Sequence, residues 1–258
     1  MDARRARGAP AALALALLVA FGLKAHYSTA PVDRLGWIMR PTAGFVELCT
    51  GLPFEREAGA GYVNREHRVI IAKACAGINF LIMAFCMLTF TLVSRAGTGC
   101  RPFLMVAAAL AAACAATVIV NGVRIMIALP HAGDAAGNGW LTAEQAHRLE
   151  GIVVYFAALT GLYCLARLVV GARIRPAVAA FVPLGWYAAM TLGVPLLNGA
   201  MRNDPALFGE HALWVLGIPI FLSGVVLLVS QVACGASGRV RTARTPPPGR
   251  LATEISPR

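Results

Sequence analysis

The stretch that decides the fold is Phe103 to Leu129, which reads FLMVAAALAAACAATVIVNGVRIMIAL. Its 27 residues contain one charged side chain, Arg124. A helix needs about 20 predominantly apolar residues to cross roughly 30 Å of hydrocarbon, because each residue adds about 1.5 Å. The stretch therefore predicts a membrane-spanning helix.

Five further apolar stretches of similar character lie on either side of it, at 9–26, 68–93, 147–170, 177–197 and 211–234. The composition agrees, since 58% of the 258 residues are hydrophobic and 14% are charged, against about 45–50% and 25% in soluble domains. We expect an all-α, polytopic transmembrane bundle of six spans. A shorter apolar patch at 36–53 contains Arg40, Pro41 and Glu47, which favours an interfacial or re-entrant helix over a seventh span.

The distribution of charge predicts the orientation of the bundle. If the N-terminus is cytoplasmic, the cytoplasmic segments carry 13 of the 23 basic residues and two of the 12 acidic ones. The positive-inside rule then places both termini in the cytoplasm. The basic start followed by an apolar run also resembles a signal peptide, but in a polytopic chain we interpret it as an uncleaved first span. Residues 1–235 are expected to form a single transmembrane domain, and 236–258 a basic cytoplasmic tail of disorder-like composition.

The net charge of +11 and the seven cysteines exclude other classes of protein. The basic residues lie in short loops and tails that flank apolar runs, so they indicate contact with the lipid bilayer and no nucleic-acid partner. The cysteines are odd in number and no two form a CxxC pair, which argues against a disulfide framework or a zinc site. No metal and no organic cofactor is predicted.

Three reactive side chains, Cys75, Arg124 and His147, lie near the ends of three consecutive spans. The orientation derived above places all three ends on the outer side of the membrane. A thiol, a permanent cation and an imidazole are the groups of a cysteine acyl-transfer site. We expect Cys75 to be the nucleophile, Arg124 to stabilise an oxyanion or orient the substrate, and His147 to transfer the proton.

The neighbours of Cys75 suit such a role. Lys73 would favour the thiolate, the small Gly77 would let a second backbone approach, and Asn79, four residues on, would share a helical face with the sulfur. The alternative interpretation is an inert cysteine beside a seam of small residues that packs two helices.

The other two candidates also have polar neighbours at helical spacing. Asn121 precedes Arg124 by three residues, so both would point into the bundle, and the alternative role for the arginine is an interfacial anchor. Glu150 follows His147 by three residues and would accept a ring N–H, although a solvated histidine at a helix start is the alternative. His211, at the outer start of the last span, is the strongest competing imidazole.

The motifs around these residues carry a family resemblance. They are, in chain order, Cys75-Ala76-Gly77, then Asn121-Gly122-Val123-Arg124, then His147 with Gly151 four residues later. In this order they resemble the exosortase/archaeosortase family. The closer match is the exosortase K branch, which Gly61-Tyr62-Val63 and Cys75-Ala76-Gly77-Ile78-Asn79-Phe80 resemble. The resemblance covers about residues 20 to 170.

The resemblance implies an activity and a partner. Family members are polytopic cysteine proteases or transpeptidases that act on exported proteins with a C-terminal sorting tail, made of a short motif, an apolar span and a basic cluster. By this resemblance the chain lies in the bacterial inner membrane, with its active site facing the periplasm. Two alternatives from other classes stay open, a transporter for an anionic solute and a non-catalytic envelope scaffold.

Overall fold

The structure, a computed structural model, describes residues 3–95, 101–131 and 142–242. Six helical segments are long and apolar enough to cross a membrane, at Gly8–Thr29, Lys73–Ser94, Pro102–Ala128, Gln145–Val169, Pro176–Leu197 and Pro205–Leu228. The prediction of an all-α, multi-pass bundle is confirmed.

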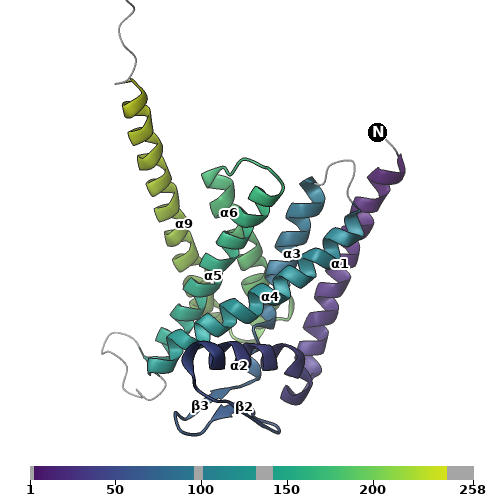
Figure 1. Cartoon of the computed structure of the whole chain (residues 1–258), viewed down its shortest axis with the longest axis vertical. Helices are drawn as coiled ribbons and strands as arrows, with labels where there is room; N and C mark the ends of the chain where they lie inside the picture. The colour runs from purple at the N-terminus through teal and green to yellow at the C-terminus, as the bar shows by residue number, and fades with distance from the viewer. Residues whose placement is uncertain (1–2, 96–100, 132–141, 243–258) are drawn as a thin grey trace, which may run out of the picture.

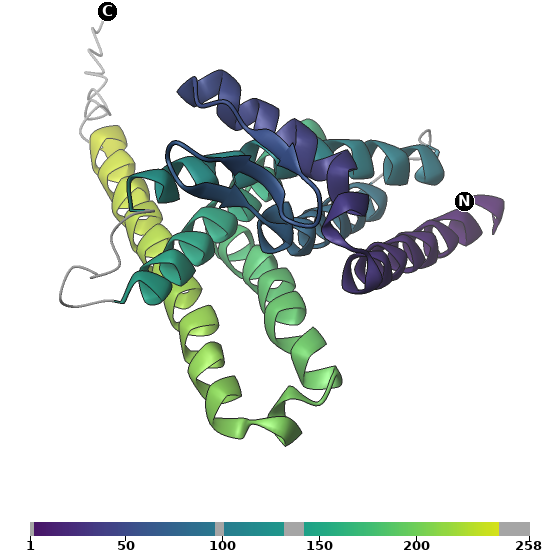
Figure 2. The ribbon, with the colours of Figure 1, turned by 90° about the horizontal axis from the view of Figure 1, so that it is seen from below.

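Long helices form this bundle (Figure 1), and a short broken segment precedes the last of them (Figure 2). The long helices are α1 (Ala3–Thr29), α3 (Ile78–Arg95), α4 (Pro102–Ala128), α5 (Ala143–Val169), α6 (Pro176–Ala188) and α9 (Pro205–Thr242). Between α6 and α9 the chain passes through a π-helix (Ala189–Gly193), α7 (Val194–Leu197) and α8 (Ala200–Asn203). Because α9 continues to Thr242, residues 236–242 of the expected tail are helical. The rest of that tail, 243–258, lies outside the described residues.

Helix α3 is the centre of the bundle. In an 18-residue apolar window of its span 83% of the residues are buried, against 17–33% in the corresponding windows of the other five. Phe80, Phe85 and Met87 are fully buried, and α1, α4, α5 and α6 pack around them. The outer helices expose large apolar side chains, for example Leu18 and Phe221, as expected of surfaces that face lipid.

The patch at 36–53 forms α2 (Gly36–Thr50), which lies across one end of the bundle (Figure 1). Its 15 residues reach only about 22 Å, too short for a span. Ile38 and Val46 lie on its buried face, while the charged Arg40 lies on its exposed face. This amphipathic pattern agrees with an interfacial helix and not with a seventh span.

A three-stranded antiparallel sheet lies beside α2. It consists of β1 (Glu55–Glu57), β2 (Gly61–Asn64) and β3 (Val69–Ile71), in the order β1-β2-β3. We call α2 and this sheet the cap. Seen from the cap end, the sheet lies over the helix ends near the middle of the molecule (Figure 2). The described start of α1 and end of α9 both lie at the opposite end (Figure 1), which agrees with two termini on one side of a membrane.

The sheet corrects the expected start of the second span, at residue 68. Val69–Ile71 pair with β2, Lys73–Ala76 form a 3-10 turn, η2, and α3 begins only at Ile78. The residues of β3 are all β-branched, which suits a strand. Periodicity alone does not distinguish such a strand from the start of a helix, because the apolar run continues into the helix.

Candidate functional site

Cys75 lies on η2, the turn that joins β3 to α3. Its backbone N–H donates to the carbonyl oxygen of Ala72 at 2.8 Å, and its own carbonyl oxygen accepts a hydrogen bond from the side-chain amide of Asn121. The turn ends at Gly77, whose φ of +70° is in the left-handed region that glycine adopts most readily. The half-buried thiol is therefore placed by a braced turn and not by a continuous helix.

Gly77 is also required by its neighbours on α4. A Cβ at this position would lie 3.0 Å from Cγ2 of Thr117 and 3.1 Å from Cγ of Asn121. The element that approaches Gly77 closely, as the sequence predicts, is therefore helix α4. This approach brings Asn121 within reach of the Cys75 carbonyl.

Arg124 lies on α4, one turn after Asn121, and its guanidinium makes three contacts with α5. Nη2 lies 2.8 Å from Nε2 of His147, Nη1 donates to the hydroxyl of Tyr155 at 3.4 Å, and Cζ lies 5.4 Å from the Tyr155 ring centre. Gly151 provides the space, because a Cβ there would lie 3.0 Å from Nε of Arg124. That Nε is buried and has no hydrogen-bond partner among the described residues.

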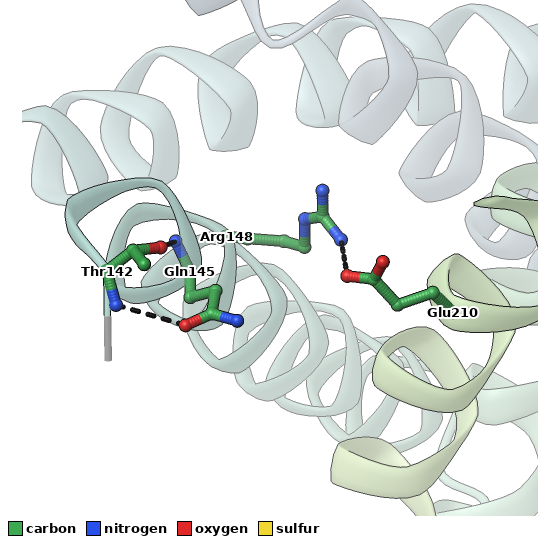
Figure 3. A network of polar contacts seen from close by, with 4 residues as sticks. All are labelled: Thr142, Gln145, Arg148 and Glu210. Atoms are coloured by element: carbon green, nitrogen blue, oxygen red, sulfur yellow. Dashed lines mark hydrogen bonds and ion pairs between the residues drawn. The ribbon is translucent and has the colours of Figure 1, made fainter. Parts of the chain in front are cut away.

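His147 lies in the second turn of α5, whose start is fixed by a capping box. The hydroxyl of Thr142 accepts from the N–H of Gln145 at 3.2 Å, and the side chain of Gln145 accepts from the N–H of Thr142 at 3.0 Å (Figure 3). Such a pair satisfies two otherwise free donors of the first turn. Arg148, next to His147, makes a 3.3 Å ion pair with Glu210 of α9 (Figure 3). The helix start that carries His147 is thus held both locally and by α9.

The contact with Arg124 determines the tautomer of His147. A guanidinium only donates hydrogen bonds, so Nε2 of the imidazole is the acceptor and carries no proton. The proton of the neutral ring then lies on Nδ1. Glu150, one turn further along α5, is half-buried, and its expected hydrogen bond to this ring stays a prediction.

Tyr155 completes a continuous series of polar contacts that sequence reasoning missed. Its hydroxyl donates to the side-chain oxygen of Asn121 at 2.7 Å and accepts from Arg124. The series leads from the Cys75 carbonyl through Asn121, Tyr155 and Arg124 to the ring of His147. Two turns separate Tyr155 from His147 on one face of α5, and this spacing is the signal that could have found it.

Two pockets meet at Arg124. The smaller, about 90 Å³, is lined by Cys75, Arg124 and His147 together with apolar residues of β3 and α4. The larger, about 250 Å³, is lined by Asn79, Arg124, Arg148 and Tyr155, among others, and by the competing imidazole, His211. The structure therefore brings the three predicted residues to one pocket, and places His211 on a different one.

Three of the expected neighbours have other contacts. Asn79 does not share a helical face with Cys75, because Gly77 breaks the helix between them, and its Oδ1 accepts from Lys24 of α1 at 2.9 Å. Lys73 donates to the carbonyl of Ala30 at 2.7 Å, so its ammonium is directed toward α1. Both polar ends of the Asn121 side chain are used by the Cys75 carbonyl and Tyr155, which gives Asn121 a positioning role.

The site combines a cysteine, an arginine and an imidazole. No three His, Cys, Asp or Glu side chains in the described ranges are grouped so that they could hold a metal ion. Comparison with protein-family models, curated proteins and solved structures finds no match. The function is therefore inferred from the chemistry of this pocket.

Proposed function

We propose that the chain is a membrane-embedded cysteine protease or transpeptidase of the exosortase type. The observation that supports this most directly is the smaller pocket, which a thiol, a guanidinium and an imidazole line together from three separate elements. The pocket lies where β3 of the cap meets the helix ends, so its substrate bond would lie at the membrane boundary. In the proposed orientation this boundary is the periplasmic face of a bacterial inner membrane.

The proposed reaction begins when the sulfur of Cys75 attacks the carbonyl carbon of the scissile peptide bond. A carbon–sulfur bond forms, and the carbonyl electrons move to oxygen, where the guanidinium of Arg124 stabilises the negative charge. The thiol proton passes to Nε2 of His147 and from there to the leaving amine as the carbon–nitrogen bond breaks. The resulting thioester is released to water in a protease, or to an acceptor amine or hydroxyl in a transpeptidase.

The contact between Arg124 and His147 defines a resting state in this scheme. Nε2 of His147 already accepts a hydrogen bond from Arg124, so it takes the thiol proton only after that bond opens. Binding of a substrate carbonyl offers the guanidinium a new acceptor. We therefore infer that substrate binding moves Arg124 from the imidazole to the carbonyl oxygen and frees the base.

The proposed partner is an exported protein whose C-terminal tail contains a short motif, an apolar span and a basic cluster. Its apolar span would lie in the bilayer beside the bundle, where the outer helices expose large apolar side chains. The basic cluster would remain on the cytoplasmic side. The short motif would then lie just outside the bilayer, at the level of the cap.

The experiment uses the chain in membranes together with such a tail-bearing protein encoded beside it. Cys75→Ala should abolish tail removal, and mass spectrometry of the mature C-terminus distinguishes hydrolysis from transfer. Cys49→Ala is the matched control, because Cys49 is exposed on α2 and lines neither of the two pockets described. Undiminished processing by purified Cys75→Ala protein would rule out the mechanism.

A transporter for an anionic solute is the second candidate. The larger pocket, lined by Arg124 and Arg148, favours it, as does the π-helix that interrupts the span at Pro176–Leu197, because broken spans form many transport sites. Vesicle uptake of an anionic solute that depends on Arg148, and that Cys75→Ala leaves unchanged, would favour transport over proteolysis.

A further inference from the structure

One edge of strand β3 borders the pocket that contains Cys75. Val69, Ile70 and Ile71, three consecutive residues, all line this pocket. Side chains alternate between the two faces of a strand, so a pocket over one face would be lined by alternate residues only. Because β2 occupies one edge of β3, the pocket lies along the other.

The backbone groups of Ile70 point to that free edge. A Cβ built on Gly61 of β2 would collide with the carbonyl oxygen of Ile71, which shows that this carbonyl points toward β2. The N–H and C=O of one residue in an antiparallel strand point to the same side, and successive residues alternate. The N–H and C=O of Ile70 therefore point away from β2.

We propose that the free edge of β3 binds the substrate peptide in extended form, as a fourth strand of the sheet. One substrate residue donates its N–H to the carbonyl of Ile70 and accepts from the N–H of Ile70. Strand addition of this kind gives affinity through main-chain hydrogen bonds. The inference rests on the proposed function and identifies how the same site takes its substrate.

The geometry also restricts the class of substrate. The N–H groups inside a helix are already bonded within the helix, so a helical segment cannot pair with Ile70. The segment that enters must be extended, and apolar residues near the end of α4, Ile125 and Ala128, line the pocket beside it. The site therefore suits an unfolded, apolar-flanked peptide that emerges from a membrane span.

The test compares Ile70→Pro with Ile70→Ala. Proline removes the outward N–H and is tolerated on an edge strand, whereas alanine keeps the N–H and removes only a side chain that is 53% exposed. The probe is acetyl-tetra-alanyl chloromethyl ketone, whose chloride is displaced by the sulfur of Cys75 to form a carbon–sulfur bond. Its labelling rate at Cys75, read by mass spectrometry, is divided by the rate with iodoacetamide, which has no peptide backbone to pair.

We expect the ratio to be about 2- to 10-fold lower in Ile70→Pro than in Ile70→Ala, the effect of one lost hydrogen bond, because both variants lose the isoleucine side chain and only alanine keeps the N–H. A second measurement leaves the protein unchanged and moves a single N-methyl group along the probe. One position should lose labelling and both of its neighbours should retain it, because only one substrate N–H faces Ile70.

Equal ratios in both variants, or an N-methyl scan without a single sensitive position, would overturn strand addition. These outcomes are distinct from failure of the proposed function, which is judged by tail removal in Cys75→Ala. A protein that keeps processing without Cys75 refutes the catalytic role, whatever the labelling ratios are.

Discussion

Gly77→Ala tests whether the turn that carries Cys75 depends on both the conformation and the packing of this glycine. A non-glycine residue in the left-handed region costs about 1–2 kcal/mol. The new Cβ would also lie 3.0 Å from Thr117 and 3.1 Å from Asn121, so Asn121 must move away. If its hydrogen bond to the Cys75 carbonyl is lost, the unpaired groups add about 1–3 kcal/mol.

The combined destabilisation of about 2–5 kcal/mol corresponds to a fall of about 4 to 20 °C in the unfolding midpoint. It is measured as loss of monodisperse protein on heating in dodecyl maltoside. The matched control is Gly161→Ala on α5, where a Cβ meets no heavy atom within 4 Å and alanine favours the helix by up to about 1 kcal/mol. Its midpoint should stay the same or rise.

A Gly77→Ala protein with an unchanged midpoint would contradict the left-handed turn. If the midpoint fell but iodoacetamide labelled Cys75 at the wild-type rate, the turn would be confirmed, while its proposed effect on the position of the sulfur would be wrong.

Three further predictions follow from the polar contacts. Tyr155→Phe leaves the side-chain oxygen of Asn121 without its donor, so the midpoint should fall by the equivalent of about 1–3 kcal/mol, measured by the same heating assay. Gly151→Ala places a Cβ 3.0 Å from Nε of Arg124, and the displaced guanidinium should lower kcat for tail removal about tenfold or more with little change in the midpoint. Glu210→Gln removes an ion pair at a carboxylate that is 54% exposed, so the midpoint should shift by less than the equivalent of about 1 kcal/mol, in low and high salt alike.

The spans could be predicted from the sequence because their signal is local. A run such as Phe103 to Leu129 needs no tertiary partner to be recognised, since its length and apolar character are sufficient. The approach of Cys75, Arg124 and His147 was also predictable, because orientation by charge placed three helix ends on one side. Their meeting at one pocket agrees with three helix ends on one side of the bundle, while the side of the membrane on which they lie and the chemistry assigned to them remain proposals.

The cap could not be predicted in the same way. Only Ala72, the short turn η2 and Gly77 separate the β-branched residues of β3 from α3, so hydropathy joins strand and helix into one run. Gly77 separates them through its backbone conformation, and a glycine in an apolar run gives no sign of its φ. The misplaced start of the span produced the wrong expectation that Asn79 shares a face with Cys75.

The polar contacts behind the site were hidden for a different reason. Tyr155 lies deep in an apolar run and resembles a core residue, and its ring does stack on Phe80 with centroids 5.1 Å apart. Only the fold reveals that its hydroxyl joins Asn121 to Arg124. Asn121 was identified, but its partner, a backbone carbonyl on another element, has no signature in the sequence.

The hydrogen bonds around Cys75 and Asn121 indicate which group in the small pocket can stabilise an oxyanion. The N–H of Cys75 is bonded to the carbonyl of Ala72, and Asn121, whose amide holds the Cys75 carbonyl, does not line the small pocket. Among the described side chains that line the small pocket, the remaining N–H donors belong to Arg124 and His147. His147 is the proposed base, and Arg124 has a buried Nε without a partner among the described residues. Because a buried unpaired donor is costly, an incoming carbonyl oxygen that bonds the guanidinium would offset this cost, and the site would be most stable when an oxyanion is present.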